Sequence, residues 1–117
     1  MATTTASISI SSSVIPGIAM NYYKTATLYK AGGCTGLTKI QSATNEYTST
    51  STVELLDESV VTTDGANKLY VKNLSTDTTE YITVYIQSEE LGRLYSSDWI
   101  FIPWSAGSSN NIQVAPS

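Results

Sequence analysis

The chain has 117 residues and a net charge of −4 at pH 7, and 14% of its residues are charged. This length is enough for one domain with a single core and too short for two. The six basic residues are scattered along the chain, and no apolar run approaches the length of a membrane span. We therefore expect neither nucleic acid nor a membrane as a partner.

The amino-terminal region is rich in serine and threonine. Ser7–Ile10 alternates like a short strand before a Pro-Gly pair interrupts the pattern. A longer β-rich run follows from Ile18 to Tyr29 and ends at two glycines. We predict a short N-terminal arm with one short strand, residues 1–17, followed by a single sandwich domain, residues 18–117.

The next segment, residues 34–50, has weak periodicity and many small polar residues. It is predicted to be a long loop, or an edge hairpin with a short strand at 37–40. Residues 32–39 share glycines with a phosphate-binding loop, but the Gly-Lys-Ser/Thr ending is missing and no helical pattern follows, which favours a flexible connection. Two further short strands are predicted at 52–56 and 59–63, followed by a turn at 64–65.

The clearest strand pattern lies in the second half of the chain. Lys68–Asn73 and Tyr81–Gln87 both alternate, and Ile82, Val84 and Ile86 share one face of the second segment. We predict that the two segments pair as a hairpin through residues 74–80. An Asn-Leu-Ser glycosylation acceptor begins at Asn73, the last residue of the first segment, and we give it little weight because we find no secretion signal in the sequence.

The remaining elements are short strands and turns. A strongly apolar strand, Trp99–Ile102, is expected to stop at Pro103. The other predicted elements are a polar turn at 89–93, a brief strand at 94–95, a turn at 96–98, a polar tip at 105–111 and a last strand at 112–114. Short strands without a helical period favour an all-β fold, a single-domain antiparallel β-sandwich or a small barrel of jelly-roll type.

The strand Trp99–Ile102 is apolar on both sides. Trp99 and Phe101 share one face, and Ile100 and Ile102 share the other. The first interpretation is a central core strand buried on both faces. The second is that one face packs against a neighbouring subunit, where tryptophan and tyrosine are favoured contact residues. A third is a carbohydrate platform built from Tyr22, Tyr23, Tyr95 or Trp104.

The sequence offers little for catalysis. It contains no histidine, so the usual general base near neutral pH is missing. Cys34 is the only cysteine, which excludes an internal disulfide and leaves a thiol without a histidine to activate it. The acidic pairs at 57–58 and 89–90 are adjacent, so on a strand their side chains would point to opposite faces. We predict no enzymatic activity, no cofactor and no metal site.

Several segments resemble a known group of proteins. Lys68–Gln87, Leu91–Trp104 and Asn111–Pro116 look like the carboxy-terminal half of small virion proteins of tailed bacteriophages, especially phages of aquatic hosts such as cyanobacteria. The resemblance covers about half of the chain and carries no catalytic signature. It implies a β-rich accessory protein of the particle, most commonly a capsid decoration or cement protein. Proteins of this kind usually carry a further apolar strand, whereas this sequence stops at Ser117, so we expect that another subunit completes the sheet or that the strand is absent.

The resemblance also implies where the chain acts and with what. It would be made in the cytoplasm of a bacterial host and reside on the capsid surface, bound to the major capsid protein and to copies of itself as a homodimer or homotrimer. The alternatives are a structural protein of the phage tail or fibre base and a carbohydrate-binding module for host recognition. Side chains of the types that dominate interfaces are the expected contact residues, namely Tyr22, Tyr23, Tyr70, Tyr85, Arg93, Trp99 and Trp104.

Overall fold

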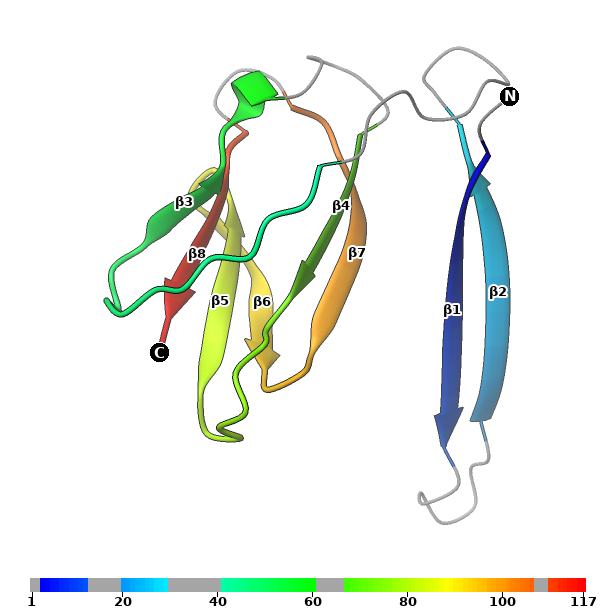
Figure 1. The fold of residues 1–117 in the computed structure, drawn as a ribbon, viewed down its shortest axis with the longest axis horizontal. Coiled ribbons are helices and arrows are strands. Elements are labelled where there is room, and N and C mark those ends of the chain that lie inside the picture. Colours follow the sequence, from blue (N-terminus) through cyan, green and yellow to red (C-terminus); the bar gives the residue numbers. More distant parts are fainter. Residues whose placement is uncertain (1–2, 13–19, 30–40, 61–66, 107–109) are drawn as a thin grey trace. The chain divides into compact units, whose positions relative to one another are not determined.

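The computed structural model describes residues 3–12, 20–29, 41–60, 67–106 and 110–117. The chain divides into two compact units, residues 1–42 and residues 43–117 (Figure 1). The predicted boundary between arm and sandwich, after residue 17, lies outside the described residues, as do Cys34, the predicted strand at 37–40 and the glycine-rich segment 32–39. No helix in the described ranges is long and apolar enough to cross a membrane.

The first unit holds two antiparallel strands of nine residues each, β1 (Thr4–Ser12) and β2 (Met20–Leu28). Their register pairs Thr4 with Leu28 and Ser12 with Met20. The strand predicted at Ser7–Ile10 therefore extends over the whole Ser/Thr-rich stretch, as β-branched threonines favour. We call this pair of strands the ribbon.

The second unit is a sandwich of two antiparallel sheets (Figure 1). One sheet has the strand order β3-β8-β5-β6, and the other pairs β4 with β7. The chain is all-β, as predicted, and the sheets do not close into the alternative barrel. The bounds are β3 (Val53–Leu56), a 3₁₀ turn (Glu58–Val60), β4 (Asn67–Lys72), β5 (Tyr81–Ile86), β6 (Glu89–Tyr95), β7 (Trp99–Trp104) and β8 (Ile112–Pro116).

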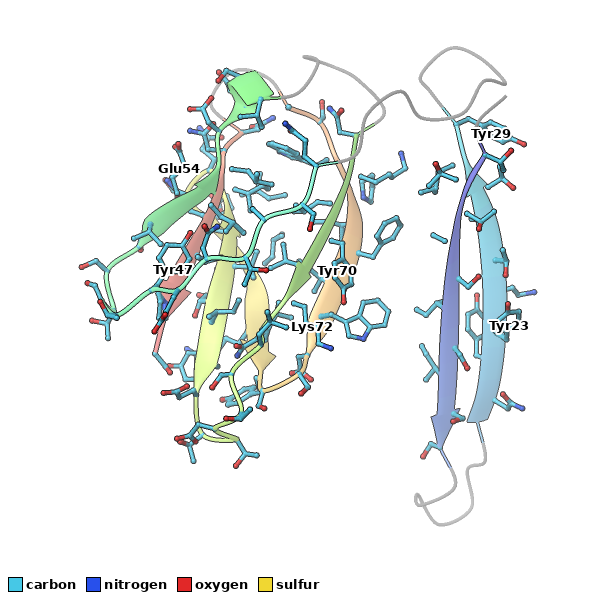
Figure 2. All side chains as sticks on the ribbon, viewed as in Figure 1. Tyr23, Tyr29, Tyr47, Glu54, Tyr70 and Lys72 are labelled. Carbon is cyan, nitrogen blue, oxygen red and sulfur yellow. The ribbon has the colours of Figure 1, made fainter. Side chains whose placement is uncertain are left out.

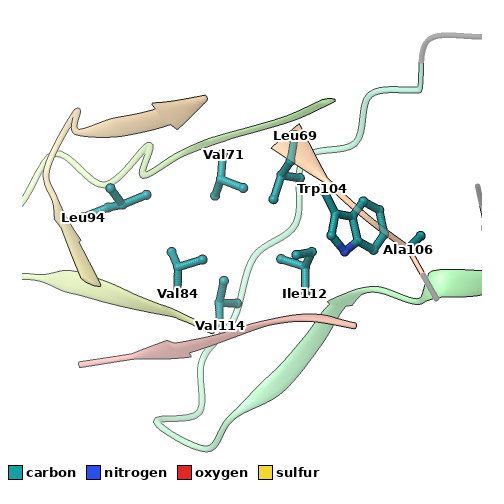
Figure 3. Packing of buried hydrophobic residues seen from close by; sticks show 8 residues of the cluster. All are labelled: Leu69, Val71, Val84, Leu94, Trp104, Ala106, Ile112 and Val114. Carbon is teal, nitrogen blue, oxygen red and sulfur yellow. The ribbon is translucent and has the colours of Figure 1, made fainter. Parts of the chain in front are cut away.

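The core fills the space between these two sheets (Figure 3). Val84, Ile112 and Val114 are the largest fully buried side chains among the described residues. Burying an aliphatic side chain of this size contributes about 1.5–3 kcal/mol. The eight residues of the cluster are Leu69, Val71, Val84, Leu94, Trp104, Ala106, Ile112 and Val114.

The predicted hairpin between Lys68–Asn73 and Tyr81–Gln87 is wrong. β4 pairs with β7, whereas β5 pairs with β6 and β8, so the two strands belong to different sheets. Both strands carry an apolar face, and those faces meet across the core when the connection, residues 73–80, passes from one sheet to the other. Stacking buries both apolar faces against each other, which pairing side by side would not do.

Other differences concern where strands begin and end. Glu89–Arg93, predicted as a turn, belongs to β6, and the reversal comes earlier at Gln87, whose φ is 57°. β7 continues through Pro103, which lies opposite Lys68 in a two-stranded sheet where a missing N–H is tolerated. The strand predicted at 59–63 overlaps the 3₁₀ turn, and residues 61–66 lie outside the described residues.

Asn73 fixes the end of β4 to the turn between β6 and β7. Its N–H donates to Asp98 O at 3.0 Å, and its carbonyl accepts from Ser97 N at 3.1 Å. Its side-chain Nδ2 donates to Leu94 O at 3.0 Å, while Oδ1 accepts from Ser75 N at 3.0 Å. The side chain is buried and bonded inside the sandwich. In the folded chain Asn73 therefore does not present its amide to a glycosylating enzyme.

Candidate functional site

The outer face of the β4–β7 sheet exposes three large aromatic side chains. Tyr70, Trp99 and Phe101 are 57%, 42% and 40% exposed, respectively. Tyr70 lies opposite Phe101 in the register, and its ring centroid is 6.0 Å from that of Trp99. Strand alternation sends Ile100 to the core side, which leaves the rings on the outside. We call Tyr70, Trp99 and Phe101 the aromatic patch.

The aromatic patch is bordered by basic residues. The register places Lys72 opposite Trp99 and Lys68 opposite Pro103, on the same outer face as the rings. Figure 2 shows Tyr70 and Lys72 on β4. A cluster of exposed aromatic rings with a polar border is typical of a protein interaction site.

The expectation that β7 is buried on both faces is not met within the sandwich unit. Ile100 and Ile102 pack against the core, but Trp99 and Phe101 remain exposed. β7 pairs only with β4 among the described strands, so it is not a central strand of a larger sheet. This geometry is compatible with the second interpretation, in which the face of Trp99 and Phe101 packs against a neighbouring subunit.

The outer face of the four-stranded sheet carries a second aromatic cluster. The rings of Tyr81 and Tyr95 lie 5.2 Å apart, and the Arg93 guanidinium lies 4.8 Å from the centre of the Tyr81 ring. Arg93 Nε is also 3.9 Å from Glu90 Oε1. A guanidinium over a tyrosine ring is a favourable cation–π contact.

A polar row crosses the same face. The registers align Glu54 with Gln113, Gln113 with Tyr85 and Tyr85 with Glu90. Glu54 Oε2 accepts a hydrogen bond from Asn111 Nδ2 at 2.6 Å, which orients one end of the row. We call this outer face, from Glu54 across to Tyr81 and Tyr95, the tyrosine face. It combines aromatic area with two exposed carboxylates.

The ribbon has one apolar and one polar face. Paired residues of an antiparallel ladder share a face, and the register therefore separates the even-numbered from the odd-numbered positions. On the polar face Ser7 Oγ and Thr25 Oγ1 are 3.0 Å apart, and Thr25 Oγ1 donates to the Tyr23 hydroxyl at 3.2 Å. The Thr25 hydrogen bond, with a smaller effect from Ser7, lowers the pKa of Tyr23. The described side chains of the apolar face, besides Lys24, are chiefly Ala6, Ile8, Ile10, Tyr22, Ala26 and Leu28.

The structure distributes the predicted contact residues over these surfaces. Tyr70 and Trp99 lie together in the aromatic patch, and Tyr85 and Arg93 lie on the tyrosine face. The adjacent positions Tyr22 and Tyr23 lie on opposite faces of the ribbon. The seventh predicted residue, Trp104, is buried.

Trp104 belongs to the core of the sandwich. Its side chain is only 4% exposed, and its indole Nε1 donates to Asn110 O at 2.7 Å. In the folded chain its ring is therefore a packing residue and has no surface to offer a partner. Of the residues named for a possible carbohydrate platform, Tyr22, Tyr23, Tyr95 or Trp104, the first two point to opposite faces of the ribbon and Trp104 is buried.

The predicted contact residues omit three members of the two aromatic surfaces, of which Tyr95 was expected only in a carbohydrate platform. Phe101 shares the face of Trp99 by simple alternation, so that signal was available in the sequence. Tyr81 and Tyr95 come together only through the register of β5 with β6. No local pattern gives that register, because the register shifts between Val84 and Tyr85.

The Asp57 carboxylate, one member of the acidic pair at 57–58, is held by hydrogen bonds in a turn. Asp57 Oδ1 accepts from Ser59 N at 2.7 Å, and hydrogen bonds from the Ser59 side chain and backbone lower the pKa of Asp57. In the described ranges no group of three or more His, Cys, Asp or Glu side chains is arranged to hold a metal ion.

Comparisons with protein-family models, with curated proteins and with solved structures return no match. The exposed surfaces described above are therefore the basis for assigning a function.

Proposed function

We propose that this chain is a non-enzymatic structural protein of a virus particle, a capsid decoration or cement protein that binds the outer shell and stabilises the contacts between capsomers. The observation that carries the proposal is the aromatic patch, three large rings exposed together on paired strands. The sequence resemblance to phage virion proteins supports the setting. The major capsid protein is the proposed partner.

The mechanism is contact without chemistry. Desolvating Trp99, Tyr70 and Phe101 against a partner supplies the binding energy, since buried aromatic side chains dominate interface energetics. Lys72, at the border of the patch, suits an acidic group on the shell. Each contact can be modest, because many symmetry-related copies that each join two capsomers together raise the free energy needed to open the shell.

Replacing Trp99 tests the role of the patch. Trp99→Ala is expected to weaken binding to undecorated particles by roughly 30-fold, the equivalent of about 2 kcal/mol for a central aromatic contact. Binding is measured as occupancy of the shell by cryo-microscopy and by sedimentation with particles. Leu74→Ala is the control, because Leu74 is a large apolar residue that is exposed outside the patch. Unchanged occupancy of the Trp99 variant would contradict the proposal.

Two further results would count against a cement function. The first is equal resistance to heat and chelation in particles with and without the protein. That result would show that the protein does not stabilise the shell. Density in a ring or trimer at the tail, instead of an icosahedral coat, would assign the chain to the tail or fibre base. The same reconstructions separate these outcomes.

A further inference from the structure

Among the described residues of its own unit, the ribbon has no second sheet packed on its apolar face. Ile10 and Tyr22 on this face are 43% and 44% exposed, and Leu28 is the one buried side chain among the described residues of 1–42. Two strands alone make a marginally stable structure in water. Covering this face with another surface would remove apolar area from water and stabilise the ribbon.

The charge on this face limits what can cover it. Lys24 and its partner Ile8 are the middle residues of the two nine-residue strands. If two ribbons packed face to face about a two-fold axis, the two Lys24 side chains would meet near that axis. Residues 1–42 contain no aspartate or glutamate to neutralise them. A pair of lysines brought together without acids is unfavourable, so a second ribbon is a poor cover.

The sandwich has the complementary charge. Residues 43–117 hold ten acidic and three basic residues, a net charge of −7, whereas residues 1–42 hold three lysines as their only charged side chains. The aromatic patch is bordered by lysines, so it does not suit Lys24. The tyrosine face offers aromatic area together with Glu54 and Glu90, and these two carboxylates outnumber its one cation, Arg93, which pairs with Glu90. Of the surfaces described above, it therefore matches the ribbon in both apolar area and charge.

We propose that the ribbon of one copy packs its apolar face on the tyrosine face of a second copy, with Lys24 directed at the carboxylate row. The geometry favours a reciprocal exchange. A nine-residue ribbon is about 30 Å long and about 10 Å wide, so one ribbon face covers about 300 Å². Counting both surfaces, one such contact buries about 600 Å², below the range of stable interfaces, whereas two reciprocal contacts bury about 1,200 Å² and reach it.

The exchange of ribbons is a specific form of the self-association expected of a cement protein, and to that extent it rests on the proposed function. It is tested on the purified full chain without particles, so its failure is distinguishable from a failure of shell binding. It also leaves the aromatic patch of each copy available for the shell, because the patch and the tyrosine face lie on different sheets of the sandwich.

Charge reversal on each side of the contact provides the test. We compare two variants, Lys24→Glu and the double variant Glu54→Lys/Glu90→Lys. Each variant by itself is expected to raise the dimer dissociation constant, measured by sedimentation velocity, at least tenfold. An equimolar mixture of the two is expected to restore dimers, because each of the two reciprocal contacts then joins a lysine to a carboxylate. Thr27→Glu, which places a carboxylate on the polar face of the same strand, is the control and should dimerise like the wild type.

Three results would overturn the proposal. The first is a wild-type chain that stays monomeric at high protein concentration. The second is charge-reversed variants that dimerise as strongly as the wild type. The third is a mixture that remains monomeric although far-ultraviolet circular dichroism shows both variants folded, which would mean that Lys24 and the two glutamates do not meet across copies.

Discussion

Asp77 shapes the connection that carries the chain from one sheet of the sandwich to the other. Its Oδ1 accepts hydrogen bonds from Thr79 N at 2.8 Å and from Thr79 Oγ1 at 2.6 Å, and its own N–H donates to Ser75 Oγ at 3.1 Å. Ser75 Oγ in turn bonds to Glu80. These bonds hold the connection by local side-chain contacts, the usual role of Asp, Ser and Thr in turns.

The hydrogen bonds to Asp77 have a pH dependence whose sign follows from its pKa. The Thr79 side chain first, and the Thr79 backbone second, lower the pKa of Asp77 below its ordinary value. The folded pKa is thus below the unfolded one, so these bonds stabilise the connection above the unfolded pKa. The stabilisation is lost as the pH falls through the folded pKa.

Titration of the Asp77 carboxyl group by NMR checks this. Thr79→Val removes the hydroxyl donor, so the Asp77 midpoint is expected to move up toward the ordinary aspartate value. Thr78→Val changes the neighbouring threonine, for which no bond to Asp77 is seen, and should leave the midpoint in place. Equal Asp77 midpoints in the wild type and the Thr79 variant would contradict the assignment.

At the scale of the element, strand β7 shows how one strand serves two purposes. Trp99 and Phe101 point outward, while Ile100, Ile102 and Trp104 point toward the core. The alternation was visible in the sequence and predicted which residues share a face. It could not show that the outer face lacks a cover within the sandwich, because burial depends on which strands pair, and two-sided apolarity fits a core strand equally well.

The two tryptophans of β7 should therefore respond differently to the same substitution. Trp104→Ala is expected to lower the free energy of unfolding by about 3–5 kcal/mol, because it empties a core site and removes the bond to Asn110. Trp99→Ala, on the exposed face, is expected to change it by less than about 1 kcal/mol. Urea unfolding of both variants measures the difference. Equal losses would mean that the outer face is covered after all.

Pairing between strands is also where sequence reasoning about the elements failed. The alternation predicted both β4 and β5 as strands, and it predicted the inward face of β5 correctly. It did not predict that they belong to different sheets, since a connection of this length is compatible with a long hairpin or with a crossing. The length of the first ribbon strand was underestimated for a different reason, because Ser and Thr positions contribute no hydrophobic signal.

At the scale of the whole molecule, the two units differ in how their stability arises. Residues 43–117 have a core made of side chains from five strands and the segment after β7. The ribbon has no comparable cluster among its described residues. The all-β class followed from the sequence, but this contrast did not, because the count of strands says nothing about how apolar faces are shared between them.

We expect residues 43–117, produced alone, to unfold in one cooperative transition, and residues 1–42 alone to show none. If the ribbon stabilises the full chain by exchange between copies, the unfolding temperature of the full chain should rise with protein concentration, while that of 43–117 should not. Circular dichroism melts at several concentrations measure both. An unfolding temperature of the full chain that does not change with protein concentration would argue against exchange between copies. A fragment 43–117 that is unfolded on its own would contradict the division into units.

The place of β8 in the four-stranded sheet has a consequence for biosynthesis. β8 lies between β3 and β5, yet it is translated after every other strand of the sandwich. Until the ribosome delivers it, β3 and β5 have no ladder joining them, and the nascent chain exposes apolar positions that later become the most deeply buried. Chaperone capture of arrested chains that end before Asn111 should therefore be stronger than capture of the released polypeptide.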